Sequence, residues 1–179
     1  QVLTQRYNLG PSVTGSAKGS IGVAEFSPEF WDQDDLTTYG ETCGLGPITV
    51  EHHRGIANQP NDCINRPSNC QESIPDIEFI KGISGTIPLS VQMQGPSLDF
   101  LAWAYQVGNL SNVDIPLVHS ISYGVDELTL QNVLKKGYYT YIDSFDIELQ
   151  KLAVRGVTVV VSSGDNGVTG ESGSYEYFQ

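Results

Sequence analysis

The segment Val157-Thr158-Val159-Val160-Val161 constrains the fold most, because it is an almost unbroken run of β-branched apolar residues. Such a run is typical of a strand covered on both faces, as in a parallel sheet between two layers of helices. Earlier segments alternate between strand-like and helix-like patterns. We expect strands over 20–26, 48–50, 89–93 and 116–122, and helices over 34–40, 72–81, 97–107 and a longer segment that carries Ile142, Phe145, Leu149 and Leu152 on one face. This alternation predicts an α/β fold with a mainly parallel sheet.

The acidic balance of the chain limits its partners. Its 179 residues include 9 Lys and Arg against 21 Asp and Glu, which gives a formal net charge of -12. This balance argues against nucleic acid as a main partner, because neutralising phosphates requires clustered cations. No apolar run approaches the ~20 residues of a membrane-spanning helix, and the first residues lack the layout of a signal peptide. We expect a soluble chain with no membrane partner, and Gln1 as a processed end.

The three cysteines give information about the cellular compartment of the protein. Cys63 and Cys70 share the polar segment DCINRPSNC, where a local disulfide is geometrically easy; the alternative is three unrelated thiols. Cys43 is then left free or paired with another chain. Asn109-Leu110-Ser111 is a sequon for N-glycosylation. Together with the acidity, these features favour a secreted, lysosomal or vacuolar protein.

Polar residues follow two of the expected strands. Functional groups of open α/β sheets gather beyond the carboxyl ends of the strands. Ile121-Ser122-Tyr123-Gly124 is one such end, and Ser162-Ser163-Gly164-Asp165-Asn166-Gly167 is the other. Asp165 could present its carboxyl group to a cleft there. The alternative is a plain turn, because Gly, Asp and Asn are the usual turn residues.

Glu72 and Asp76 form an acidic pair at the opening of a predicted helix. Side chains four residues apart lie on one face of a helix, with Cβ atoms about 5–6 Å apart. In a dry site such carboxyl groups share a proton, so the pair can act as acid and base at acidic pH. The alternative is that the helix dipole favours acidic residues at this end.

Other hydrolytic and nucleotide chemistries have little support. His52 and His53 lie in a loop-like EHHRG stretch and His119 lies inside a strand, so no zinc-ligand spacing occurs. The chain also lacks the glycine patterns that bind phosphates.

Several motifs in order resemble the sedolisin family of serine-carboxyl peptidases. They are Arg6-Tyr7-Asn8-Leu9, Glu72 with Asp76-Ile77, Ser122-Tyr123-Gly124 with Asp126-Glu127, and Arg155-Gly156-Val157 leading to Ser162-Ser163-Gly164-Asp165-Asn166-Gly167. The resemblance implies a subtilisin-like α/β fold, with residues 1–179 as the N-terminal part of one peptidase domain.

The resemblance also implies roles for these residues. Glu72 would be the general base that takes the proton of a nucleophilic serine, and Asp76 would hold Glu72 and share its proton. A protonated Asp165 would donate a hydrogen bond to the oxyanion. Ser122, Tyr123 and Gly124 would pair with the substrate backbone and line its primary pocket.

The chain departs from the family pattern in two respects. The Ser-Gly-Thr-Ser-Ala-type motif of the nucleophile is missing, and Ser84-Gly85-Thr86 is rejected because Ile87-Pro88 and a strand pattern follow it. Gln33 stands near a position where relatives often carry an acidic residue that supports the Glu/Asp pair.

Three explanations fit the missing serine: a C-terminal chain of the same precursor that carries it, a truncated form, or an inactive splice form. We favour the first, and Cys43 could reach that chain. Calcium is expected in the whole enzyme, with its ligands in the C-terminal part and no metal site in this chain. Substrates would be peptides or proteins, with endopeptidase and tripeptidyl-peptidase action both open. Competing interpretations are a non-catalytic binding domain and a flavodoxin-like small-molecule binder.

Overall fold

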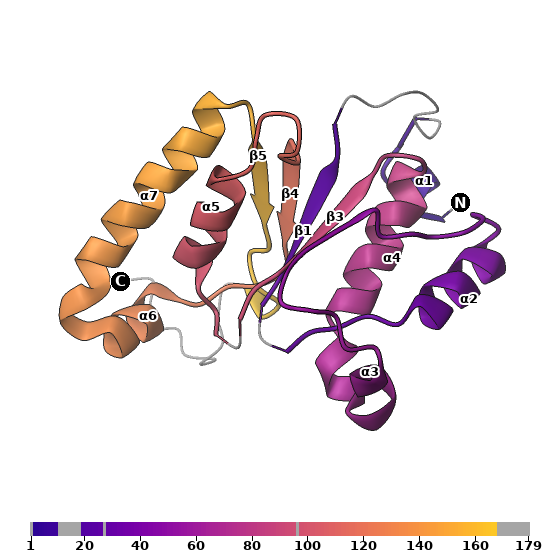
Figure 1. Cartoon of the computed structure of the whole chain (residues 1–179), viewed down its shortest axis with the longest axis horizontal. Helices are drawn as coiled ribbons and strands as arrows, with labels where there is room; N and C mark the ends of the chain where they lie inside the picture. Colours follow the sequence, from indigo (N-terminus) through magenta and orange to yellow (C-terminus); the bar gives the residue numbers. More distant parts are fainter. Residues whose placement is uncertain (1, 11–18, 27, 96, 168–179) are drawn as a thin grey trace.

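A computed structural model describes residues 2–10, 19–26, 28–95 and 97–167, so Gln1 and Gln179 lie outside it. The described strands form one parallel sheet in the order β2-β3-β1-β4-β5 (Figure 1). The strands are β1 Ile21–Glu25, β2 His52–Gly55, β3 Leu89–Met93, β4 Val118–Ile121 and β5 Thr158–Val161. The predicted α/β fold with a parallel sheet is confirmed.

Helices cover the sheet in two layers. The helices α2 (Gln33–Cys43) and α4 (Ser73–Ser84) lie on one side, and α5 (Phe100–Gly108) and α7 (Tyr138–Val154) on the other (Figure 1). Side chains of β1 alternate between the layers, because Val23 joins the core beneath α2 and α4 and Ala24 the core beneath α5 and α7. The shorter elements are α1 Val2–Arg6, α3 Asn61–Asn65, η1 Pro67–Cys70, α6 Glu127–Leu134 and η2 Lys135–Gly137.

Aspartate caps fix where several helices begin. The Asp32 side chain accepts a hydrogen bond from the Asp34 amide at 2.8 Å, and Asp99 accepts one from the Ala102 amide at 3.0 Å. Gly44 ends α2 with φ 65°, a left-handed conformation that glycine adopts without cost. Within the described residues, no helix is both long and apolar enough to cross a membrane.

His119 is a core residue. Its ring is fully buried on β4, lies edge-on to Trp103 with centroids 5.4 Å apart, and holds the Pro116 carbonyl at 3.1 Å through Nε2. A Cβ at Gly22 would overlap with its Nδ1, so β1 needs glycine there. Burial lowers the pKa of His119 to about 4, which favours the neutral ring.

The prediction of a strand at 48–50 was wrong. The strand that pairs with β3 is the more polar His52–Gly55, whose sequence pattern is loop-like. Ile48 is instead a buried side chain of the core cluster that also contains Trp31. The segment before Cys70 also holds α3 and η1, and α6 was not expected at all.

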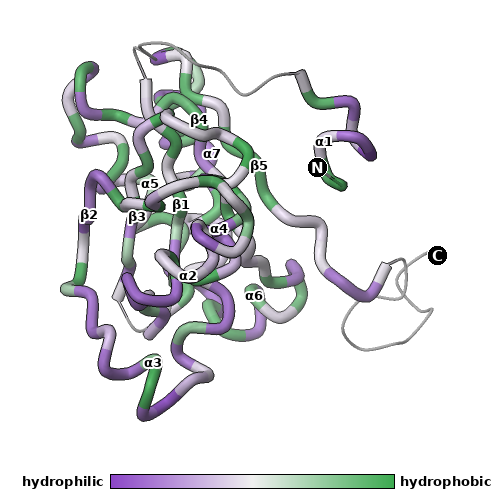
Figure 2. The backbone as a smooth tube through the Cα atoms, turned by 90° about the vertical axis from the view of Figure 1, so that its right-hand side faces the viewer, coloured by the Kyte–Doolittle hydropathy of each residue, from purple (hydrophilic) through white to green (hydrophobic). Residues whose placement is uncertain are grey.

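The expectation that the valine run is covered on both faces was also wrong for the described part of the protein. In β5, Val160 is 55% exposed and Val161 is 53% exposed. Helices α5 and α7 cover one face, whereas the face on the side of α4 is open beside β4 and β5 (Figure 2). An apolar groove of about 370 Å³ lies there, lined among others by Ile21, Phe79, Ile83, Val118 and Val160.

Candidate active site

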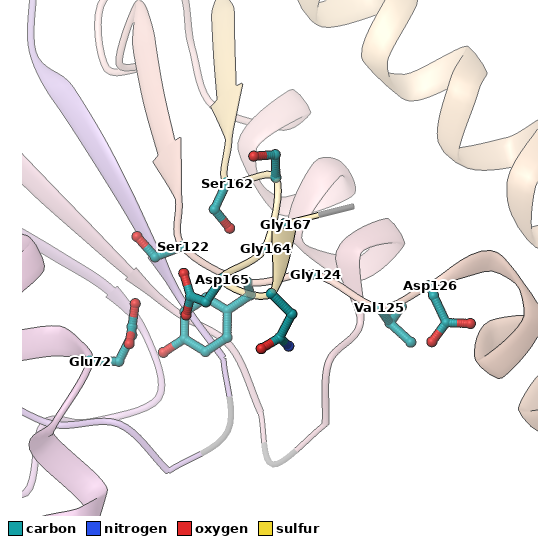
Figure 3. A pocket seen from close by; sticks show the side chains of 12 residues that line it. Glu72, Ser122, Gly124, Val125, Asp126, Ser162, Gly164, Asp165 and Gly167 are labelled. Atoms are coloured by element: carbon teal, nitrogen blue, oxygen red, sulfur yellow. The ribbon is translucent and has the colours of Figure 1, made fainter. Parts of the chain in front are cut away.

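A pocket of about 640 Å³ lies beyond the carboxyl ends of β4 and β5. Its lining comes from three parts of the chain: Glu72 before α4, the segment 122–126 after β4, and the segment 162–167 after β5. Because α4 runs antiparallel to the strands, its first turn meets the same edge of the sheet (Figure 1). Figure 3 shows the side chains of Glu72 and Asp165 on the same side of this pocket, with Ser122 beside them at its wall.

Asp76 lies one helical turn after Glu72 and bonds to the segment after β4. The Ser122 hydroxyl donates a hydrogen bond to Asp76 Oδ1 at 2.9 Å. The other carboxylate oxygen, Oδ2, is buried and has no hydrogen-bond partner among the residues that the structure describes. Burial raises the pKa of Asp76 despite the bond from Ser122. All six predicted catalytic and substrate-binding residues are therefore gathered at one edge of the sheet.

Glu72 is surrounded by like charges. Burial first, and then Asp76, Glu29 and Asp165, raise the pKa of its carboxyl group. A group with this surrounding holds a proton more readily than a free glutamate and is ionised only part of the time in acid. Glu72 is half-buried, so it is accessible to a substrate in the pocket.

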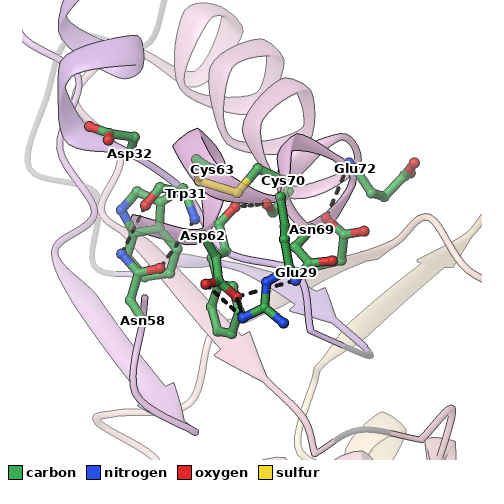
Figure 4. Close-up of a disulfide and its surroundings, with 12 residues drawn as sticks. Glu29, Trp31, Asp32, Asn58, Asp62, Cys63, Asn69, Cys70 and Glu72 are labelled. Carbon is green, nitrogen blue, oxygen red and sulfur yellow. Dashed lines mark hydrogen bonds and ion pairs between the residues drawn. A yellow bond between two sulfur atoms is a disulfide. The ribbon is translucent and has the colours of Figure 1, made fainter. Parts of the chain in front are cut away.

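The loop after β1 anchors the start of α4. The Ser73 hydroxyl donates to the Phe30 carbonyl, and the Phe30 amide donates to the Asn69 carbonyl at 2.6 Å. The Glu72 amide donates to Glu29 Oε2 at 3.4 Å (Figure 4). These bonds fix the backbone from which the Glu72 side chain extends.

A disulfide closes the same region. Cys63 and Cys70 are bonded, two residues before Glu72 (Figure 4). Asp62 closes this loop further through Arg66 at 2.7 Å and Asn69 at 3.2 Å. Cys43 is free in this chain and exposed at the end of α2.

Opening this loop is expected to destabilise the protein. The double replacement Cys63→Ala/Cys70→Ala should lower the free energy of unfolding by about 2–3 kcal/mol, because the unfolded chain gains the entropy of an open loop. Urea unfolding curves measure the loss. The control Cys43→Ala removes an exposed thiol and should change the value by less than about 0.5 kcal/mol. Equal stabilities of wild type and double variant would contradict the assignment.

Two further carboxyl groups of the site were not singled out from the sequence. Glu25 ends β1 with 0% exposure, and Glu29 is half-buried beside Glu72. The Tyr123 hydroxyl donates to Glu25 Oε2 at 2.8 Å. Burial first, and then Asp76, raise the pKa of Glu25 well above its ordinary value. The signal that could have found it is an acidic residue at the end of the otherwise apolar strand Ile21–Glu25.

Gln33 and Asn109 lie away from the pocket lining. The Gln33 side chain donates to the Ile48 carbonyl at 2.8 Å and so braces α2 against the core. Asn109 follows α5 and is exposed at the amino-end edge of the sheet, opposite the pocket. Among the residues that the structure describes, no group of three or more His, Cys, Asp or Glu side chains is arranged to hold a metal ion.

Comparison with known proteins defines the class. No family model matches the chain. A solved structure of Pseudomonas sedolisin, a serine-carboxyl proteinase complexed with two molecules of pseudo-iodotyrostatin, has the same fold. The TM-score is 0.60 at 16% identity, over 91% of this chain and 43% of that one.

Curated relatives agree with this class. The chain is 31% identical to tripeptidyl-peptidase 1 of Dictyostelium discoideum over 173 residues and 30% identical to that of Mus musculus over 175 residues. Each match covers 93% of this chain but 26% and 28% of the relatives, so the chain spans about a quarter of their length. The chain belongs to the sedolisin family.

Proposed function

We propose that this chain supplies the carboxyl groups of an acid-acting serine-carboxyl peptidase. The observation that supports this best is the single pocket that holds Glu72, Asp165 and the segment 122–124, with Asp76 bonded to Ser122 at its wall. In this proposal residues 1–179 are the N-terminal part of a peptidase domain. The nucleophilic serine belongs to a further polypeptide segment, which we propose is a C-terminal chain of the same precursor.

The chemistry follows from the positions of the carboxyl groups. Glu72 takes the proton of the serine hydroxyl as the serine oxygen attacks the peptide carbonyl carbon. A protonated Asp165 donates a hydrogen bond to the oxygen that becomes negative. Glu72 then gives its proton to the departing amine, which leaves an ester between the substrate and the serine. Water, deprotonated by Glu72, hydrolyses this ester and restores the serine.

An acidic working pH suits this set of groups. Glu72 and Asp76 have raised pKa values because of burial, and the charge of Asp76 adds to the effect at Glu72. The pair therefore retains one shared proton in mild acid, where Glu72 can still act as a base. The proposed oxyanion contact uses the protonated form of Asp165, because a carboxylate has no hydrogen to donate.

The open face beside β4 and β5 supports the proposal that a further polypeptide segment is present. Phe79 is 52% exposed and Ile83 is 38% exposed on α4, across the groove from the exposed Val118 and Val160. Contiguous apolar surface of this kind usually marks an interaction site. We propose that the serine-bearing segment covers this groove, which adjoins the pocket through α4 and the ends of β4 and β5.

Substrates, compartment and metal follow as parts of the same proposal. The curated relatives are named tripeptidyl-peptidases, and we propose peptides or proteins as substrates. The disulfide and the exposed Asn109 sequon suit a lysosomal, vacuolar or secreted protein. We further propose that calcium is held by the C-terminal part.

Mass spectrometry of the natively purified protein tests the proposal. Denatured spectra with and without reductant should reveal a serine-bearing segment, either continuous with these residues or as a second chain. If a second chain separates from this one only after reduction, a disulfide joins the two chains, and the exposed Cys43 is assigned to it. If these residues occur without any such segment and no peptide is cleaved in acid, the proposal is wrong and a binding domain is the better interpretation.

A further inference from the structure

Of the three histidines of the chain, only His119 lies in the core. Its side chain is 0% exposed on β4, whereas His52 and His53 are exposed on β2. Because β4 lies between β1 and β5, His119 has Gly22 as its register partner on one side and Val159 on the other. Trp103 of α5 packs against the ring. Since water does not reach the ring, the residues around it decide whether it can carry a charge.

Hydrogen bonding fixes which nitrogen of this ring carries the hydrogen. Nε2 lies 3.1 Å from the Pro116 carbonyl oxygen, which can only accept, so Nε2 donates. Nδ1 is then the nitrogen without a hydrogen, and it is buried with no hydrogen-bond partner in the described part of the chain. Gly22 packs closely against Nδ1, which leaves no room for an acceptor on that side. The site therefore fits the neutral ring and does not fit a second N–H.

No described neighbour compensates a positive charge on His119. The Trp103 indole has an N–H that donates and no atom that accepts. The layer of β1, β4, β5, α5 and α7, with its adjoining loops, has these buried or half-buried titratable side chains: Glu25, Asp99, Tyr123, Tyr138, Tyr141, Glu148 and Arg155. None of them is among the causes that shift the pKa of His119. Those causes are burial, which lowers the pKa, and the Pro116 carbonyl, which raises it less.

We propose that His119 sets the acid limit of the folded protein, because its ring packs between β1 and α5 only while Nδ1 is free of a proton. A proton there places an uncompensated charge and an unpaired N–H inside this layer. β4 continues directly into the pocket segment 122–126, where Ser122 bonds to Asp76. Loosening β4 therefore also loosens one wall of the candidate active site. The inference concerns the stability of the fold and does not rest on the proposed function.

The direction of the pKa shift gives the pH range of the effect. The pKa of His119 is lowered from 6.5 to about 4 in the folded protein, so the unfolded chain takes up the proton first as the pH falls. The stability that the neutral ring contributes is full above about pH 6.5 and is lost as the pH falls to about 4. Over this range we expect the folding equilibrium to shift about 100-fold toward the unfolded chain through this residue.

Melting temperatures of the natively purified protein, with all accompanying chains present, test the proposal. His119→Gln removes the titrating ring and keeps a side-chain N–H that can donate to the Pro116 carbonyl. From about pH 7 to about pH 4, the Tm of this variant should rise relative to that of wild type by about 5 °C or more. The control His52→Gln makes the same substitution at an exposed position of β2 and should follow the wild-type curve.

An NMR titration of the wild-type protein with labelled histidine provides a readout that needs no variant. The ring signal of His119 is recognised by its contact with Trp103, whose ring centroid lies 5.4 Å away. This signal should keep the chemical shift of a neutral ring, with the hydrogen on Nε2, as the pH falls to about 4. If His119→Gln does not fold, this titration decides alone.

Three results would overturn the proposal. The first is a Tm difference between folded His119→Gln and wild type that does not vary with pH. The second is an equal change in His52→Gln, and the third is a His119 ring that becomes charged near pH 6.5 in the folded protein. None of these readouts depends on peptide cleavage, so a failure of the proposed peptidase function and a failure of this inference are told apart.

Discussion

Replacing Glu72 by glutamine is expected to lower kcat for peptide hydrolysis by about 10²- to 10⁴-fold. The variant keeps the size and polarity of the side chain at the pocket wall, but an amide cannot accept the serine proton. KM should change little, because the side chain acts on the reacting proton and not on the remote substrate. Steady-state kinetics at about pH 4 on the protein with its serine-bearing segment measures the effect.

Glu78→Gln is the matched control for this change. It makes the same substitution on α4, the helix that Glu72 precedes, and Glu78 does not line the pocket. Its kcat should stay within about twofold of wild type. Undiminished turnover in Glu72→Gln would remove Glu72 from the role of base.

Replacing Asp165 by alanine is expected to lower kcat by about 10²- to 10³-fold. In the proposed mechanism Asp165 donates to the oxyanion, which forms only during the reaction, so kcat falls and KM stays nearly constant. The side chain is exposed after β5, so the melting temperature should be unchanged.

The control for Asp165 is Asp146→Ala, which removes an exposed aspartate from α7 on the far side of the sheet. It should leave both kcat and KM as in wild type. Wild-type kcat in Asp165→Ala would contradict the oxyanion role, and a rise in KM alone would assign Asp165 to substrate binding.

The parallel sheet could be predicted from the sequence because its central strands are apolar. In β1 and β3 the core side chains Val23, Leu89 and Val91 are wholly buried and repeat with the strand period. The edge strand β2 lacks this signal. It is held by its backbone bonds to β3 and by His53 against Trp31, with ring centroids 5.3 Å apart, and a local pattern cannot reveal such a partner.

The residues of the candidate site also divide into those that could be predicted from the sequence and those that could not. Local rules, namely a helix start or the carboxyl end of a strand, make Glu72, Ser122 and Asp165 candidates. The resemblance to the sedolisin family then selects them over the alternatives of a plain turn and a helix-dipole preference. Glu25 could not be selected in this way, because its hydrogen-bond partner Tyr123 is 98 residues away in the sequence. The expectation that Val160 is covered on both faces was wrong for the described residues. An apolar strand sequence indicates that the strand is buried, but it does not indicate which segment covers it.

The most direct test of the account is the pH dependence of peptide hydrolysis by the natively purified protein, with Glu72→Gln measured beside it. The account predicts a kcat/KM that is highest at about pH 4, lower by about tenfold or more at neutral pH, and lost in the variant. Hydrolysis that is equally fast at neutral pH, or that persists in Glu72→Gln, would contradict it.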